Sequence, residues 1–143
     1  LEAALSNAHA VSERARAMAE MTKSGYVYVI SNIGSFGEDV VKIGLTRRLE
    51  PDERVKELGD ASVPFGFDTH AMIYSEEAPA LEAALHREFA ERRVNQVNSR
   101  KEFFRVGLGE IQAAIEEMVD DEVDFTVTAK ADDYFQSKRL LAA

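Results

Sequence analysis

Two strongly apolar segments joined by a short connection restrict the fold of this chain more than any other feature. Residues 26–30 (YVYVI) and 40–45 (VVKIGL) are rich in β-branched and aromatic side chains, and the first segment is apolar at both odd and even positions. Such a segment is typical of a central strand that is covered on both faces. Because the connection is too short for a crossover helix, we expect an antiparallel hairpin.

Helical and strand patterns alternate after this hairpin. Pro51 fits the first turn of a helix that stops at Gly59, and residues 67–74 fit a third strand. Residues 75–94 then show an apolar stripe at helical spacing. Two weaker patterns follow, a short closing strand at residues 102–106 and an amphipathic helix at residues 111–118. The expected fold is of the α/β (α+β) class, a small antiparallel three-stranded sheet flanked by helices.

The predicted domain, residues 24–120, has an extension at each end. Residues 1–23 carry small apolar side chains at helical spacing, which predicts a long N-terminal helix that ends a longer helical or coiled-coil region. This helix could pair two chains or contact an upstream domain. Residues 121–143 form an acidic C-terminal extension, in which residues 123–127 alternate like a small strand.

The distribution of charge bears on whether the chain binds nucleic acid. The net charge of −9 argues against such a partner, because phosphate binding depends on Lys and Arg. Residues 106–143, however, hold nine acidic and only three basic side chains, whereas residues 42–105 hold twelve and eleven. The middle of the chain can therefore present local positive surface, although solvated helix faces would show the same composition.

Composition also excludes several classes of site and location. Cysteine is absent, so disulfides, zinc–thiolate sites and thiol nucleophiles are excluded. No apolar run approaches the roughly 20 residues that a membrane-spanning helix needs, and the first residues lack a signal-peptide pattern. We expect a soluble, cytoplasmic protein without membrane contact.

Four side chains suited to phosphate chemistry follow one another along the predicted elements. Tyr28 lies in the first strand, Lys42 in the second, Arg54 in the first helix and Glu82 in the second helix. Their order and rough spacing resemble those of the GIY-YIG nuclease superfamily. Each motif alone is weak, whereas several in the correct order are fairly specific.

The two defining triplets of that superfamily are both altered here. Residues 26–28 (YVY) stand in place of GIY, and residues 42–44 (KIG) stand in place of YIG. The KIG triplet and the phrase RKEFF at residues 100–104 resemble a phage- and prophage-associated branch. The resemblance covers about residues 24–106 and implies a metal-dependent DNA endonuclease that hydrolyses phosphodiester bonds by a one-metal mechanism.

The resemblance also implies a role for each main residue. Glu82 would hold Mg²⁺ or Mn²⁺, which assists the leaving 3′ oxygen, and Arg54 would clamp the scissile phosphate. Tyr28 would lie beside the attacking water. A phenol is a poor base at neutral pH, so Tyr28 would need the charges of Lys42 and Arg54 nearby to favour its phenolate. His86 lies one helical turn after Glu82, as a proton shuttle or a ligand-supporting group.

Ordinary structural roles compete with these assignments. Tyr28 could be a core residue of its strand, Arg54 could pair with a neighbouring helix carboxylate, and His86 could be polar surface. Further candidates rest on the resemblance or on local charge. Supporting candidates are Tyr26, Gly44, Asn95 and Asn98. DNA-contacting candidates are Arg47, Arg48, Arg92 and Arg93.

Two other functions fit the same sequence. The acidic balance and the lysine in the second triplet are compatible with a catalytically degenerate DNA-binding or regulatory module. The N-terminal pattern is compatible with a helix-mediated assembly domain. The phosphate-binding candidates supply no device that reads bases, so the sequence predicts no DNA specificity.

Overall fold

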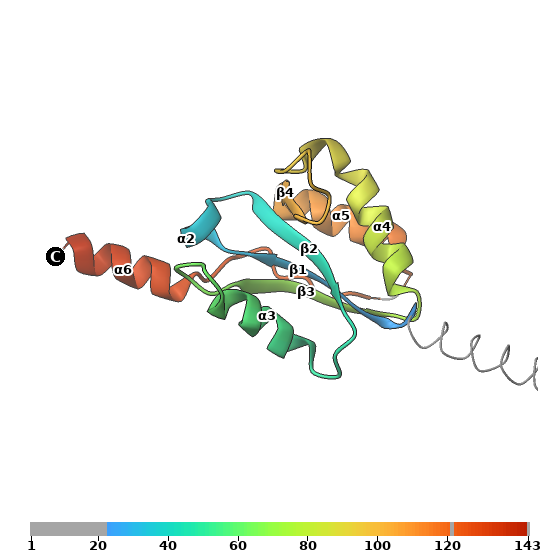
Figure 1. Cartoon of the computed structure of the whole chain (residues 1–143), viewed down its shortest axis with the longest axis horizontal. Coiled ribbons are helices and arrows are strands. Elements are labelled where there is room, and N and C mark those ends of the chain that lie inside the picture. Colours follow the sequence, from blue (N-terminus) through green and yellow to red (C-terminus); the bar gives the residue numbers. More distant parts are fainter. Residues whose placement is uncertain (1–22, 121, 143) are drawn as a thin grey trace, which may run out of the picture.

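The computed structural model describes residues 23–120 and 122–142 and shows a four-stranded antiparallel sheet with helices on both faces (Figure 1). The strands are β1 (Gly25–Ser31), β2 (Val40–Thr46), β3 (Asp68–Ser75) and β4 (Phe103–Arg105), in the order β3-β1-β2-β4. The α/β class is as predicted. The expected three-stranded sheet is wrong by one strand, because β4 pairs with the start of β2 and extends the sheet.

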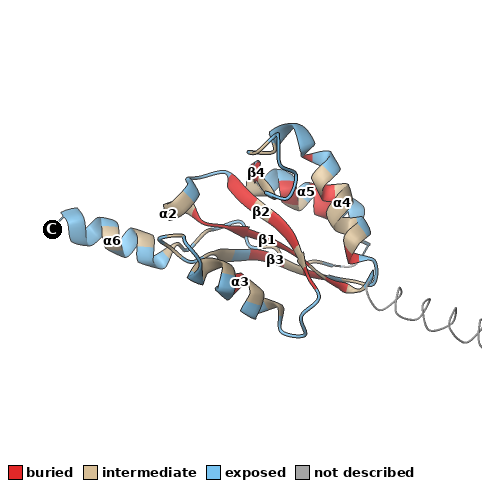
Figure 2. Ribbon diagram, in the orientation of Figure 1, coloured by how far each residue is buried: buried red, intermediate tan, exposed pale blue. Residues whose placement is uncertain are grey.

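β1 is the central strand, and the sequence shows why. It pairs antiparallel with both β2 and β3. Val27 and Val29 belong to the larger core cluster, and Tyr28 and Ile30 belong to a smaller cluster that includes Val55 of a helix. Each face of β1 is therefore covered, which explains the run without polar alternation and the buried sheet centre in Figure 2.

Helices cover the two faces and place charged residues beside the sheet. The helices are α2 (Ile33–Phe36), α3 (Pro51–Asp60), α4 (Ala78–Glu88), α5 (Leu108–Met118) and α6 (Asp132–Ala142).

The helix α4 ends at Glu88, before the predicted end near Val94. Phe89 leaves the helical conformation and is buried, and a 3-10 turn at Ala90–Arg92 then leads the chain toward β4.

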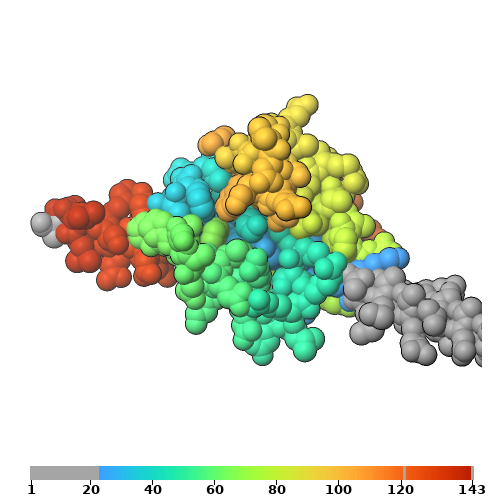
Figure 3. Space-filling model, in the orientation of Figure 1, coloured from blue at the N-terminus to red at the C-terminus, as the bar shows by residue number. Residues whose placement is uncertain are grey.

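The acidic C-terminal extension is attached to the sheet through His70 and Asp68 of β3, where Ala131 N donates to Asp68 Oδ2 over 3.0 Å. Thr126 N donates to His70 O over 2.9 Å, and His70 Nδ1 lies 2.6 Å from Thr126 O. Residues 122–131 have no regular secondary structure, so the predicted strand at residues 123–127 is wrong. This segment leads into α6, which the sequence did not predict and which extends away from the sheet (Figures 1 and 3).

Two expectations concern the ends of the chain and membranes. The predicted N-terminal helix at residues 1–23 lies, except for Lys23, outside the described residues. Within residues 23–120 and 122–142, every helix is too short or too polar to span a bilayer.

Candidate active site

Tyr28 lies at the centre of the candidate site and is fixed by its neighbour across the sheet. It is paired with Gly44 of β2, and only 2% of the residue is exposed. A Cβ on Gly44 would overlap the phenol oxygen and approach the ring carbon Cε2 to 2.7 Å. Glycine at this position therefore gives the phenol the space that it occupies. Tyr28 also packs in the smaller core cluster, so the structural role and the site position coincide.

Arg54 reaches Tyr28 from α3. Pro51 begins this helix, and Val55 packs beside Tyr28 in the smaller cluster, which fixes the helix against the strand. Arg54 forms a hydrogen bond with Tyr28 and an ion pair with Glu57 at 3.6 Å. The predicted helix-surface pairing is thus present together with a contact to the candidate site.

Burial affects the ionisation of Tyr28 more than its charged neighbours do. Burial and then the charge of Glu102 raise the pKa of the phenol to about 12. Arg54 lowers the pKa by its charge and hydrogen bond, but this effect is smaller than that of burial. Tyr28 is therefore a neutral phenol at physiological pH in the protein alone, because the charge of Arg54 does not offset the effect of burial.

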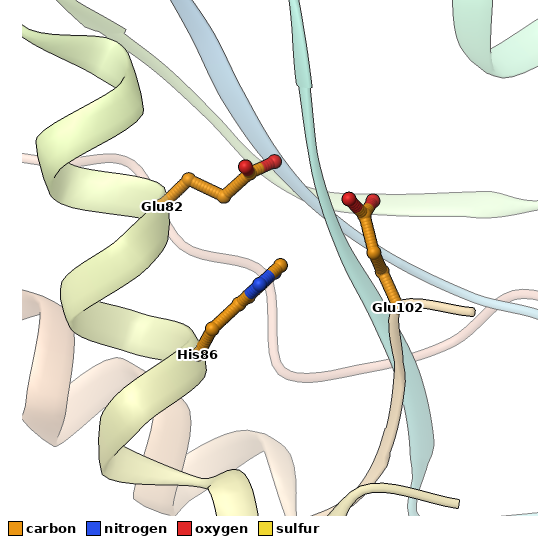
Figure 4. A group of neighbouring side chains, drawn as sticks. All are labelled: Glu82, His86 and Glu102. Atoms are coloured by element: carbon orange, nitrogen blue, oxygen red, sulfur yellow. The ribbon is translucent and has the colours of Figure 1, made fainter. Parts of the chain in front are cut away.

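Three potential metal ligands meet beside β2. Glu82 and His86 lie one turn apart on α4 and point toward Glu102, which directly precedes β4 (Figure 4). One ligand atom from each residue lies within 4.8 Å of the others. Two carboxylates and an imidazole form a donor set that suits a divalent cation.

The ring of His86 is oriented by the backbone of β2. Its Nε2 donates to Ile43 O over 2.8 Å, because a carbonyl oxygen can only accept. Desolvation lowers the pKa of His86, more than the hydrogen bond to Ile43 raises it, so the imidazole is neutral at physiological pH. Nδ1 then carries the lone pair, which is the state required of a metal ligand.

Lys42 supplies the cation nearest to Glu102. Its Nζ lies 3.3 Å from Glu102 Oε2, and the two side chains are 12% and 25% exposed. The pairing follows from sheet register, since β2 meets β4 at Lys42 and Phe103 and Ile43 N donates to Glu102 O over 3.1 Å. The half-buried ion pair therefore closes the side of the site formed by β2 and β4.

The two carboxylates make ionisation of Glu82 costly. Desolvation and then the charge of Glu102 raise the pKa of Glu82 to about 7, although Lys42 and Arg47 lower it. A carboxylate that is partly desolvated beside another carboxylate is stabilised by a bound cation. The raised pKa of Glu82 and the geometry of the three ligands thus both favour a bound cation.

The structure brings together the five predicted catalytic residues and separates them from the supporting candidate Tyr26. Tyr28, Lys42, Arg54, Glu82 and His86 lie around one site, with Gly44 beneath Tyr28. Tyr26 instead packs edge-to-face on Tyr74, with ring centroids 5.5 Å apart.

Asn95 and Asn98 shape the exposed loop before β4. Asn95 Oδ1 accepts from the backbone N–H groups of Val97 and Asn98, and Asn98 Oδ1 accepts from Arg100 N. Their side-chain oxygens are therefore used within the loop. These contacts give both residues a structural role and do not connect them to the site.

The predicted DNA-contacting arginines Arg48, Arg92 and Arg93 make side-chain contacts within the chain. Arg48 pairs with Glu57, and Arg92 pairs with Glu110. Arg93 donates to Ser99 O over 2.9 Å and lies over the ring of Phe104. The charge of Arg47 acts on Glu82, and the charge of Arg93 acts on His86. Arg47 and Arg93 are thus the two of these arginines that the structure links electrostatically to the candidate site.

Glu102 is the site residue that the sequence reasoning missed. The phrase at residues 100–104 drew attention only as part of the resemblance, and nothing local distinguishes this carboxylate from other exposed ones. Its position depends on the pairing of β4 with β2, a contact between residues about 60 positions apart. An expectation that residues 102–106 pair with the strand containing Lys42 would have found it.

Comparison with known proteins gives one family match. The family model described as T5orf172 domain matches residues 25–119, which include every strand of the sheet and all of the site residues above. No curated protein and no solved structure matches the chain.

Proposed function

The chain belongs to the T5orf172 domain family, and from this premise we propose that it is a metal-dependent DNA endonuclease domain of the GIY-YIG type. T5orf172 domains are phage-associated and are often DNA-binding or associated with nucleases. The family thus supports a role on DNA, and the proposal adds the reaction and its residues.

One observation carries the proposal. Side chains from β1, β2, α3 and α4, far apart in sequence, gather around Tyr28 and the three potential metal ligands. They provide a phenol, a guanidinium, an ammonium and carboxylates in one place. Hydrolysis of a phosphodiester needs these functions, namely a positioned water, charge neutralisation at phosphorus and help for the leaving oxygen.

Tyr28 and Arg54 act on the attacking side in this proposal. Water adds to phosphorus, the bond from phosphorus to the 3′ oxygen breaks, and the net proton transfer is from water to that oxygen. Tyr28 is a neutral phenol and therefore orients the water by hydrogen bonding. Arg54 is permanently charged and neutralises the phosphate oxygens as negative charge accumulates on them.

Glu82, His86 and Glu102 act on the leaving side. Their donor set fits Mg²⁺ or Mn²⁺, and a bound divalent ion would stabilise the negative charge on the leaving 3′ oxygen. His86 is placed here as a ligand in preference to the earlier suggestion of a proton shuttle, because its Nε2 proton is engaged by Ile43 O.

A second candidate is a DNA-binding module that does not cut. The observations in its favour are the pKa of Tyr28, raised to about 12, and the intrachain pairing of Arg48 and Arg92. In this alternative the Lys42–Glu102 ion pair has a structural role only. The assembly function suggested by the N-terminal pattern depends on residues 1–22, outside the described part of the chain.

Nicking of supercoiled plasmid tests the proposal directly. The 143-residue chain should convert plasmid to the open-circular form with Mn²⁺ or Mg²⁺ and not with EDTA, while DNA binding is followed separately by fluorescence anisotropy in Ca²⁺. Binding without nicking would favour the second candidate. Neither binding nor nicking would refute both.

Gly44→Ala should strongly reduce nicking, because the added methyl group displaces the phenol of Tyr28. A displacement of about 1 Å at a reacting centre can cost roughly 100-fold in rate, and we expect a loss of that order. Gly109→Ala is the control, because its Cβ would meet no atom within 4 Å. With the fold of both variants checked by circular dichroism, nicking by Gly44→Ala within twofold of wild type would contradict the role of Tyr28.

A further inference from the structure

Lys42 is placed as a counterion for the potential metal ligands. Its ammonium group contacts Glu102 at 3.3 Å and lies 5.5 Å from the centre of the Phe103 ring. Glu102 is also one of the three residues whose ligand atoms lie within 4.8 Å of one another. One carboxylate thus serves both the lysine and the donor set.

The nitrogen ligand of this donor set is oriented in advance. His86 donates through Nε2 to Ile43 O, which fixes the ring and leaves Nδ1 as the nitrogen with a lone pair. Imidazole is a better ligand for divalent transition ions than for Mg²⁺, which prefers oxygen ligands and retains water.

We infer that Lys42 is an internal cation that holds Glu102 until a transition-type divalent ion binds to Glu82, His86 and Glu102, and that this ion then competes with the ammonium for Glu102. The inference rests on the proposed function for the purpose of the metal, but metal binding itself can be measured without DNA. The regulated step at the site is the exchange of the Lys42 ammonium for the divalent ion as the partner of Glu102.

The charges and contacts around Lys42 favour such an exchange. Without metal, the ammonium offsets part of the repulsion between the two carboxylates, which keeps the site formed. With metal, the divalent charge replaces the single charge of Lys42, and the Phe103 ring remains as a second partner for the ammonium. Lys42 then has donors free for a phosphate oxygen of the substrate.

Lys42→Met tests the competition, because methionine keeps the length of the side chain and removes its charge. Isothermal titration of the full 143-residue chain with Mn²⁺ at constant pH should show binding at least about ten-fold tighter than in wild type. Lys56→Met, at an exposed position of α3, should leave the affinity unchanged. Unchanged or weaker Mn²⁺ binding by Lys42→Met would overturn the inference.

Glu102→Gln distinguishes competition for one carboxylate from general repulsion between cations. Glu102→Gln should weaken Mn²⁺ binding, and adding Lys42→Met to it should change the affinity less than twofold. If Lys42→Met increased Mn²⁺ affinity in the Glu102→Gln background as much as it does in wild type, Lys42 would act only through its charge at a distance. That result would overturn direct competition for Glu102.

His86→Gln tests the preference for a transition ion. Wild type should bind Mn²⁺ more tightly than Mg²⁺, and the substitution should reduce Mn²⁺ affinity by about ten-fold or more while changing Mg²⁺ affinity much less. Equal losses for both ions would contradict the nitrogen ligand. These measurements also separate the two hypotheses, because the predicted metal binding without nicking would refute only the nuclease, and nicking with unaltered metal binding would refute only the exchange.

Discussion

Glu82→Gln is expected to abolish metal-dependent nicking while leaving the fold intact. Loss of a group that merely supports a metal ligand typically costs 10- to 100-fold in affinity or activity, so loss of a ligand should cost at least about 100-fold. Glu82 is a half-buried residue of α4 beside the core, and glutamine preserves its size. Glu88→Gln, at an exposed position of the same helix, is the matched control. Equal nicking by Glu82→Gln would place the metal elsewhere.

The same substitution should stabilise the metal-free protein at high pH. The folded state raises the pKa of Glu82 from 4.5 to about 7, so the folded protein holds this proton more tightly than the unfolded chain does. Well below pH 4.5 the carboxyl is neutral in both states and does not change the free energy of unfolding. Between pH 4.5 and 7 the unfolded state ionises first, so stability falls, and above about pH 7 the cost is constant.

The size of this cost follows from the pKa difference. At 1.36 kcal/mol per pKa unit, the shift corresponds to about 3 kcal/mol, and solvent screening of a partly exposed group reduces it to roughly 1–3 kcal/mol. Urea unfolding in EDTA at pH 4.5 and pH 8 should show Glu82→Gln to be more stable than wild type only at pH 8. Saturating Mn²⁺ should remove the difference. Lower stability of the variant at pH 8 would contradict the electrostatic strain at this site.

The parts of the fold predicted from sequence are those that local patterns specify. The run at residues 26–30 specifies a strand covered on both faces, and Pro51 specifies the start of α3. The end of α4 was misjudged, because burial of Phe89 overrides the apolar spacing that continues beyond it. The helix α6 was missed, because it has no buried residue and hence no apolar stripe facing a core.

The predicted site shows the same division between local and distant information. Tyr28, Lys42, Arg54 and Glu82 are identified by their ordered resemblance to the GIY-YIG nucleases, because their places in strands and helices alone do not distinguish them. The structure brings them together. Glu102 and the orientation of His86 depend on contacts between residues far apart in the chain. The high pKa of Tyr28 likewise depends on burial by α3 and the neighbouring strands, which a charge pattern along the sequence does not contain.

Arg54→Ala should lower the turnover of nicking by about 100- to 1,000-fold, the range for removing one donor that meets transition-state charge. The free energy of unfolding should fall by about 1–3 kcal/mol, because the variant removes the hydrogen-bond partner of the buried phenol of Tyr28. The lost ion pair with Glu57 adds little, since it is exposed and Arg48 still pairs with Glu57. DNA affinity in Ca²⁺ should change much less than turnover, since one phosphate contact is a small part of general DNA attraction.

Alanine substitutions of Arg92 and Arg47 are the controls for Arg54→Ala. Arg92→Ala removes an exposed pair with Glu110 on the opposite side of β4 from β2 and should alter turnover by less than about threefold. Arg47→Ala should weaken DNA binding more than it slows turnover, because the charge of Arg47 acts on Glu82 and no role in meeting the transition state is assigned to it. Arg54→Lys keeps the charge but loses the paired donors and should fall between Arg54→Ala and wild type. Similar losses for all three alanine variants would show that these arginines supply general attraction to phosphate, and the assignment of Arg54 to the transition state would be wrong.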